Sequence, residues 1–142
     1  MKKKYIIFDF DWTLVDSKTK EFFDGVVEMI ERLAKDYTLF ISSRSMEDFL
    51  KQKLKSVWIY DYFEVVFGSG VIEKWPKHIE TFDLLIWEDD FSEKTIFVWD
   101  WEIDRELAKE TWLIFVKVWK ESKDYYEIEK TTDLEKLLPK IK

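Results

Sequence analysis

The chain has 142 residues, no cysteine and a formal net charge of −7. The negative charge disfavours a protein that binds nucleic acid through its phosphates, and the lack of cysteine excludes disulfides and favours a reducing, cytoplasmic compartment. No run of about eighteen apolar residues is present, so no membrane partner is expected.

Strand and helix patterns alternate along the chain. Strands are predicted over 4–10, 37–41, 63–67, 95–99 and 112–118, and helices over 18–35, 46–55, 77–86, 103–110 and 131–138. This alternation is typical of an α/β protein with a mainly parallel sheet covered on both faces. We predict one Rossmann-like three-layer domain over residues 1–142. The segments 16–37 and 45–73 are too short for a large cap, and the charged segment 120–136 indicates a solvated loop and helix face.

The first predicted strand ends in two aspartates, Asp9 and Asp11, followed by Trp12 and Thr13. Alternate residues of a strand share a face, so the two carboxylates should point the same way. Like charges held together repel, and such a pair persists mainly where a metal ion or a positive substrate group lies between them. The alternative is an ordinary strand with a polar turn, because Asp is common in turns. The pattern predicts a ligand site at the carboxyl end of this strand.

The pattern Asp-x-Asp-x-Thr after an apolar strand resembles motif I of the haloacid dehalogenase (HAD) superfamily. The resemblance implies that Asp9 is the nucleophile, that Asp11 is the acid/base and that Thr13 contributes to phosphate binding. Ser42, at the end of the predicted strand 37–41, matches motif II, in which a hydroxyl binds a phosphoryl oxygen. Ser43 is the second candidate, and helix capping is the alternative for both serines.

The region Glu73–His78 resembles motif III, whose lysine offsets negative charge around the nucleophile. Lys74 is favoured because the family usually has the lysine just ahead of the proline, here Pro76. Lys77 is the second candidate and is grouped with the phosphate-binding residues. A solvated lysine is the alternative for either position.

The predicted strand 95–99 runs into Asp100, and Asp104 follows four residues later. This arrangement resembles motif IV, which completes a Mg²⁺ site. The resemblance implies that Asp9, Asp11, Asp100 and Asp104 form the metal site, and hard oxygen ligands suit this ion. Complementing the dipole of a following helix would also account for Asp104, but not for Asp100.

The resemblance implies a Mg²⁺-dependent phosphatase that hydrolyses a phosphate monoester through an aspartyl-phosphate. Its partner would be a phosphorylated small molecule or macromolecule. Capless relatives either take large substrates or close their sites as homo-oligomers, so the oligomeric state and the substrate stay open. One alternative is a catalytically impaired HAD-like binding or regulatory module. A phospho-accepting receiver domain is a further alternative, but its acids are not normally arranged as Asp-x-Asp-x-Thr.

The chain contains eight tryptophans and only three glycines, whereas average glycine usage of about 7% would give about ten glycines. Trp12 and Trp99 occupy places where the resembled motifs have glycine, and Trp58 and Trp112 follow predicted helices where glycine is usual. A tryptophan in left-handed backbone costs roughly 1–2 kcal/mol. We hypothesise that tryptophan replaces glycine, either through a codon read differently in the native genetic code or by substitution or design. Ordinary core or surface aromatics are the alternative.

Overall fold

The computed structural model describes residues 4–43, 45–68, 94–99, 114–118, 126–128 and 131–140. The predicted helices 77–86 and 103–110 lie outside these residues.

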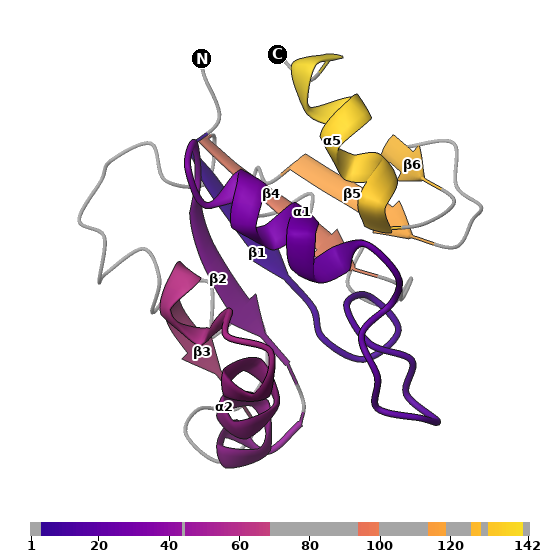
Figure 1. Ribbon diagram of the computed structural model, residues 1–142. Coiled ribbons are helices and arrows are strands. Elements are labelled where there is room, and N and C mark those ends of the chain that lie inside the picture. Colours follow the sequence, from indigo (N-terminus) through magenta and orange to yellow (C-terminus); the bar gives the residue numbers. More distant parts are fainter. Residues whose placement is uncertain are drawn as a thin grey trace.

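The described strands form one six-stranded parallel sheet in the order β3-β2-β1-β4-β5-β6 (Figure 1). The strands are β1 (Tyr5–Phe8), β2 (Thr38–Ser42), β3 (Phe63–Phe67), β4 (Thr95–Trp99), β5 (Ile114–Val118) and β6 (Tyr126–Ile128). The α/β class with a mainly parallel sheet is therefore confirmed, and β3 and β4 have the predicted bounds.

Strand β6 is a difference from the prediction, because it falls within the charged segment 120–136 that was expected to be loop and helix. It pairs with β5 through Val116 and Tyr126, Lys117 and Glu127, and Val118 and Ile128. A three-residue strand at the edge of a sheet is too short to give a recognisable alternation of apolar and polar residues.

The strand order reverses at β1. The chain proceeds from β1 to β2 and β3 on one side, and β4, β5 and β6 then lie on the other side. Phe8 at the end of β1 is therefore aligned with Ile41 of β2 and with Val98 of β4. Ligands of open α/β sheets bind beyond the carboxyl ends of the strands at such a reversal. The residues that follow β1 therefore lie where a ligand site is expected in this fold.

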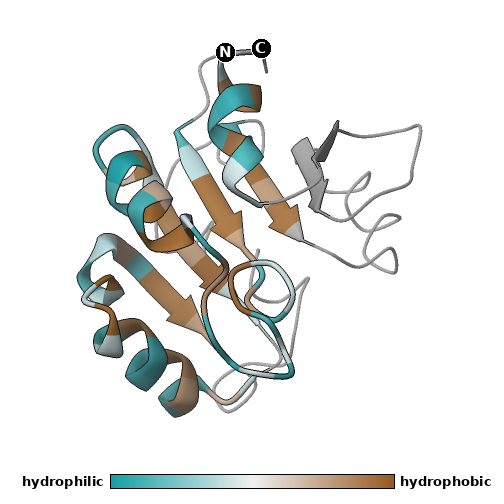
Figure 2. Ribbon diagram, turned by 45° about the vertical axis from the view of Figure 1, so that its right-hand side comes forward, coloured by the Kyte–Doolittle hydropathy of each residue, from teal (hydrophilic) through white to brown (hydrophobic). Residues whose placement is uncertain are grey.

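Both faces of the central strand are covered. Ile6 and Phe8 belong to the main core cluster, and Ile7, which points to the opposite face, is fully buried as well. A strand that is buried on both faces is typical of a parallel sheet between helical layers. Figure 2 shows the matching pattern, because the strands that it colours are hydrophobic over most of their length and the coloured helices have mixed hydropathy.

The helices of the described residues are α1 (Val26–Leu33), α2 (Glu47–Ser56) and α5 (Leu134–Leu137), with short 3₁₀ turns η1 (Tyr60–Tyr62), η4 (Thr131–Asp133) and η5 (Leu138–Lys140). Helix α1 lies beside α5 in Figure 1. Arg32 of α1 donates two hydrogen bonds to the Glu135 carboxylate of α5, at 2.8 and 2.6 Å. These bonds lower the pKa of Glu135. No helix in the described ranges is long and apolar enough to cross a membrane.

Helix α1 begins at Val26, eight residues later than the predicted start at residue 18. The Asp16 carboxylate accepts hydrogen bonds from the amides of Lys18 and Thr19, at 2.8 and 3.3 Å. Such local bonds offer the backbone an alternative to helix. Gly25, with φ +82°, then turns the chain into α1. Residues 16–25 therefore form a loop that carries polar side chains back towards the end of β1.

Helix α2 ends at a left-handed tryptophan. Trp58 has φ +64°, its amide donates to the Lys55 carbonyl at 3.2 Å, and the Ile59 amide donates to the Leu54 carbonyl at 3.1 Å. These two bonds, with Ile59 and Leu54 both buried in the core, form a Schellman motif, whose left-handed residue is usually glycine. The prediction of a glycine-type position at Trp58 is confirmed.

Candidate active site

Asp9 and Asp11 follow β1 directly, and both are partly exposed. The Asp9 amide continues the sheet by donating to the Val98 carbonyl at 2.9 Å, and its carboxylate accepts the Phe10 amide at 2.8 Å. Phe10 between them is fully buried, while both aspartates are partly exposed. Burial therefore alternates along the segment, with the aromatic ring in the core and a partly exposed aspartate on each side of it. The common direction of the two carboxylates stays a prediction.

The chain turns sharply after Asp11. The amides of Thr13, Leu14 and Val15 all approach the Phe10 carbonyl, at 3.1, 2.8 and 3.3 Å, and the Trp12 amide donates to the Val15 carbonyl at 2.8 Å. Trp12 adopts a left-handed conformation in this turn, with φ +61°. The prediction that Trp12 occupies a glycine-type position is confirmed, and 37% of its surface is exposed beside the acidic pair.

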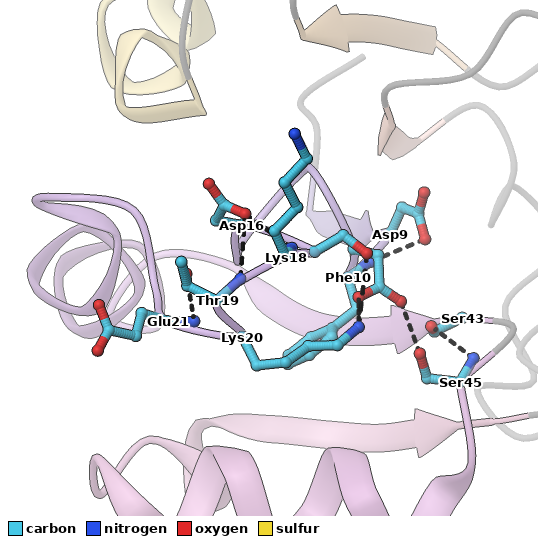
Figure 3. Close-up of polar contacts among 11 residues, drawn as sticks. Asp9, Phe10, Asp16, Lys18, Thr19, Lys20, Glu21, Ser43 and Ser45 are labelled. Carbon is cyan, nitrogen blue, oxygen red and sulfur yellow. Dashed lines mark hydrogen bonds and ion pairs between the residues drawn. The ribbon is translucent and has the colours of Figure 1, made fainter.

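Two side chains hold the Asp11 carboxylate, and sequence reasoning missed both (Figure 3). The Ser45 hydroxyl donates to Oδ2 at 2.6 Å, and the Lys20 ammonium donates to Oδ1 at 3.1 Å. Ser45 belongs to the same run of serines as Ser42, which was the available signal in the sequence. Lys20 gave no such signal, because it lies in a segment that was predicted to be helical.

The predicted motif II serines lie at the end of β2, next to β1. Ser42 ends β2 and Ser43 follows it, and both are almost fully buried. The Ser43 amide donates to the Phe67 carbonyl at 3.0 Å, and its hydroxyl accepts the Ser45 amide at 3.1 Å. Ser43 thus supports the short turn that presents Ser45 to Asp11. Phosphate binding by Ser42 and Ser43 stays a prediction.

A glycine after β3 allows this turn to lie where it does. A Cβ added at Gly68 would come within 2.5 Å of the Ser45 carbonyl oxygen and of the Glu47 amide nitrogen. Both are backbone atoms, so a side chain at Gly68 would displace the segment that carries Ser45.

Thr13 lies beneath the loop and not at its exposed face. Its hydroxyl is buried and has no hydrogen-bond partner among the described residues, and its carbonyl accepts a hydrogen bond from the Thr131 hydroxyl. This geometry makes Thr13 an anchor between the loop and the C-terminal segment. It gives no support to the expected contact of its hydroxyl with phosphate.

Four predicted site residues lie outside the described residues: Lys74, Lys77, Asp100 and Asp104. Where the structure does describe side chains, no three of His, Cys, Asp and Glu converge as a metal cluster. Of the four predicted metal ligands, the structure describes Asp9 and Asp11, and their role in a metal site stays a prediction.

Trp99 differs from Trp12 and Trp58. It is the last residue of β4 and has extended strand backbone, so the left-handed argument for a glycine position does not apply to it. Trp112 lies outside the described residues.

These observations define a Rossmann-like α/β protein with an acidic site at the reversal point of its sheet. The sequence profile of the haloacid dehalogenase-like hydrolases matches residues 17–118. The match covers well over half of the chain and begins after Thr13, so it is independent of the aspartate motif. The chain belongs to this family, and the resemblance drawn from its motifs is confirmed.

Several solved structures share the fold along nearly the whole chain. A HAD-superfamily hydrolase from Ehrlichia chaffeensis has a TM-score of 0.78 and 17% identity, covering 99% of this chain and 98% of that chain. The core domain of a candidate phosphoglycolate phosphatase from Streptococcus pneumoniae has a TM-score of 0.75 and 20% identity, covering 99% and 98%. A candidate HAD-hydrolase from Bacillus subtilis bound to magnesium has a TM-score of 0.77 and 14% identity, covering 97% and 99%. None of the curated protein sequences compared with this chain matches it.

Proposed function

We propose that this chain is a phosphatase that hydrolyses a phosphate monoester through an aspartyl-phosphate on Asp9. The observation that carries the proposal is the position of Asp9 and Asp11, both partly exposed at the carboxyl end of the strand where the sheet order reverses. Membership of a hydrolase family supports it. A phosphatase of this kind needs a nucleophile and a separate acid/base, and the two aspartates supply both.

In the proposed reaction, Asp9 attacks phosphorus, and an O–P bond forms while the bond to the leaving oxygen breaks. Asp11 donates a proton to that oxygen. Asp11 then accepts a proton from water as the water attacks the phosphorus, and the bond between Asp9 and phosphorus breaks. Inorganic phosphate leaves, and the Asp9 carboxylate is restored. The buried ring of Phe10, which lies between the two aspartates in sequence, anchors this segment in the core.

We propose Mg²⁺ as the cofactor, with Asp9, Asp11, Asp100 and Asp104 as the residues that would hold it. The fit rests on the partly exposed Asp9 carboxylate, which is the kind of hard oxygen donor that Mg²⁺ prefers. Asp100 directly follows β4 in sequence, and β4 is hydrogen-bonded to β1. The bound ion would offset negative charge on the transferred group, which is the main source of rate gain in phosphoryl transfer. Lys74 is proposed to add a second positive charge.

The second candidate function is a HAD-like binding module with impaired catalysis, and Trp12 is the observation that favours it. Trp12 directly follows Asp11, and its backbone has a left-handed conformation that suits glycine. A side chain there could crowd the approach of a phosphate. Hydrolysis of p-nitrophenyl phosphate by the unsubstituted protein distinguishes the two functions, because a binding module should show no hydrolysis.

The test of the proposal is Asp9→Asn, which removes the attacking anion and keeps the shape of the side chain. We expect hydrolysis of p-nitrophenyl phosphate with Mg²⁺ to fall to the background rate, while the circular dichroism spectrum stays unchanged. Excess chelator should abolish the parent activity, and added Mg²⁺ should restore it.

Asp36→Asn is the matched control, because Asp36 is an exposed aspartate just before β2, at the opposite edge of the sheet. It should retain the parent rate. Normal turnover by Asp9→Asn would end the aspartyl-phosphate mechanism, and undiminished activity in chelator would end the metal assignment.

A further inference from the structure

Lys20 has a backbone conformation that a lysine rarely adopts. It lies in the loop between β1 and α1 with φ +62°, and its amide donates to the Asp16 carbonyl at 2.7 Å. Left-handed backbone is unfavourable for any residue with a Cβ, and it persists where surrounding contacts determine the conformation. The contacts of the Lys20 side chain are therefore informative.

Those contacts join three parts of the molecule. The Lys20 ammonium lies 3.1 Å from Asp11 Oδ1 and 3.4 Å from Ser17 Oγ, and 5.8 Å from the centre of the Phe49 ring on α2. Phe49 in turn packs edge-on against Phe10, with ring centres 6.3 Å apart. The ammonium is thus held between its own loop, the end of β1 and α2.

Lys20 and Ser45 together occupy both oxygens of Asp11. Ser45 donates to Oδ2 from one side, and Lys20 donates to Oδ1 from the other (Figure 3). A carboxylate with a separate donor on each oxygen is restrained in its rotation as well as its position. Each donor comes from a different loop, so the orientation of Asp11 depends on two segments that are remote in sequence.

We propose that Lys20 is a positioning residue for Asp11, acting together with Ser45. The inference rests on the proposed function, in which Asp11 must place one oxygen on the leaving group. Misplacement of a reacting group by about 1 Å can cost about 10²-fold in rate. The ion pair itself is partly exposed, with 42% of the Lys20 and 29% of the Asp11 side chain accessible. Such pairs add little to stability, so the main effect of the Lys20–Asp11 pair is expected on the rate of the acid/base step.

The kinetic test uses Lys20→Gly, which removes the ammonium and at the same time relieves the left-handed strain. The substrates are p-nitrophenyl phosphate, whose leaving group needs little protonation, and phenyl phosphate, whose leaving group needs more. We expect kcat/KM, which reports the attack of Asp9 and the departure of the leaving group, to fall about 10-fold or more for phenyl phosphate and less than about threefold for p-nitrophenyl phosphate. Asp11→Asn and Ser45→Ala should also lose more activity on phenyl phosphate than on p-nitrophenyl phosphate. Lys20→Arg keeps a positive charge and should retain most of the parent activity.

Lys18→Gly is the matched control, because Lys18 is an exposed lysine of the same loop. It should leave the ratio of the two rates unchanged. An equal loss on both substrates in Lys20→Gly would indicate a merely structural residue and would overturn the proposal, as would no loss at all.

A second measurement does not need turnover. Lys20→Met keeps a side chain at the left-handed position and removes the charge. We expect it to lower the urea midpoint of unfolding slightly in the parent, as suits a partly exposed pair, and to leave it unchanged in an Asp11→Ala background, where the acceptor of the Lys20 ammonium is gone. Equal shifts in both backgrounds would overturn the proposal. If the parent hydrolyses no phosphate ester, the proposed function fails, and this comparison alone decides whether Lys20 holds Asp11.

Discussion

Trp12 and Trp58 have nearly the same backbone conformation in two very different regions. Their φ angles are +61° and +64°, so both carry the same kind of strain from the Cβ atom. Trp58 closes the C-terminal end of α2 with 88% of its surface exposed. Trp12 is in the turn after β1, directly next to Asp11.

The comparison separates a cost in stability from a cost in chemistry. At Trp58 the hydrogen bonds are local to the helix end, so the strain weakens only the fold. At Trp12 the strained turn also sets the position of Asp11, whose two oxygens are held from other loops. Two left-handed tryptophans support the hypothesis that tryptophan stands where the fold requires glycine. The eight tryptophan codons distinguish a difference in genetic code from design.

The largest expected effect is on activity at Trp12. Trp12→Gly relieves the turn that carries Asp11 and removes the indole beside it, so we predict a rise in p-nitrophenyl phosphate hydrolysis of up to about 10²-fold. Trp58→Gly is the matched control and should leave the rate unchanged. If the two variants have the same activity as the parent, the strain at Trp12 does not reach the site.

The second prediction concerns the anchor beneath the Trp12 turn. Thr131→Val removes the hydroxyl that donates to the Thr13 carbonyl and leaves that buried group unpaired. We expect the free energy of unfolding to fall by about 1–3 kcal/mol, measured by urea denaturation. Thr132→Val should change it much less, because the neighbouring Thr132 is partly exposed. An equal effect of both substitutions would show that the anchor is unimportant.

The smallest effect is expected at Trp58. Trp58→Gly should raise the free energy of unfolding by about 1 kcal/mol, because glycine escapes the Cβ penalty. For a chain of this length, the melting temperature should rise by about 3 °C. Trp58→Ala keeps the Cβ and removes the indole, so it should give no gain. A gain from alanine as large as that from glycine would assign the effect to the exposed ring and not to the backbone.

The sequence predicted the sheet and the acidic pair well, because both depend on local patterns. β-branched and aromatic runs predicted β1 to β5 but not the three-residue strand β6, and the two aspartates follow the predicted first strand as partly exposed residues. The predicted start of α1 was wrong because the hydrogen bonds of the Asp16 carboxylate to the backbone, and the turn at Gly25, compete with helix formation.

The partners of Asp11 could not be predicted in the same way. Lys20 and Ser45 are separated from it by nine and thirty-four residues, and they meet it only through the tertiary arrangement of two loops. The left-handed conformation of Trp12 was predictable, since the resembled motif has glycine at that place. The burial of the Thr13 hydroxyl was not, because it depends on contact with the C-terminal segment.

The most direct test of the central claim is to identify the residue that carries the phosphoryl group. Asp11→Asn should slow the attack of water on the phosphorylated enzyme, so brief reaction with p-nitrophenyl phosphate and Mg²⁺ followed by acid quenching should trap it. Peptide mass spectrometry should then locate one added phosphoryl group on Asp9, and Asp9→Asn should show none. A phosphoryl group on another residue, or steady turnover with no phosphorylated enzyme, would contradict the account.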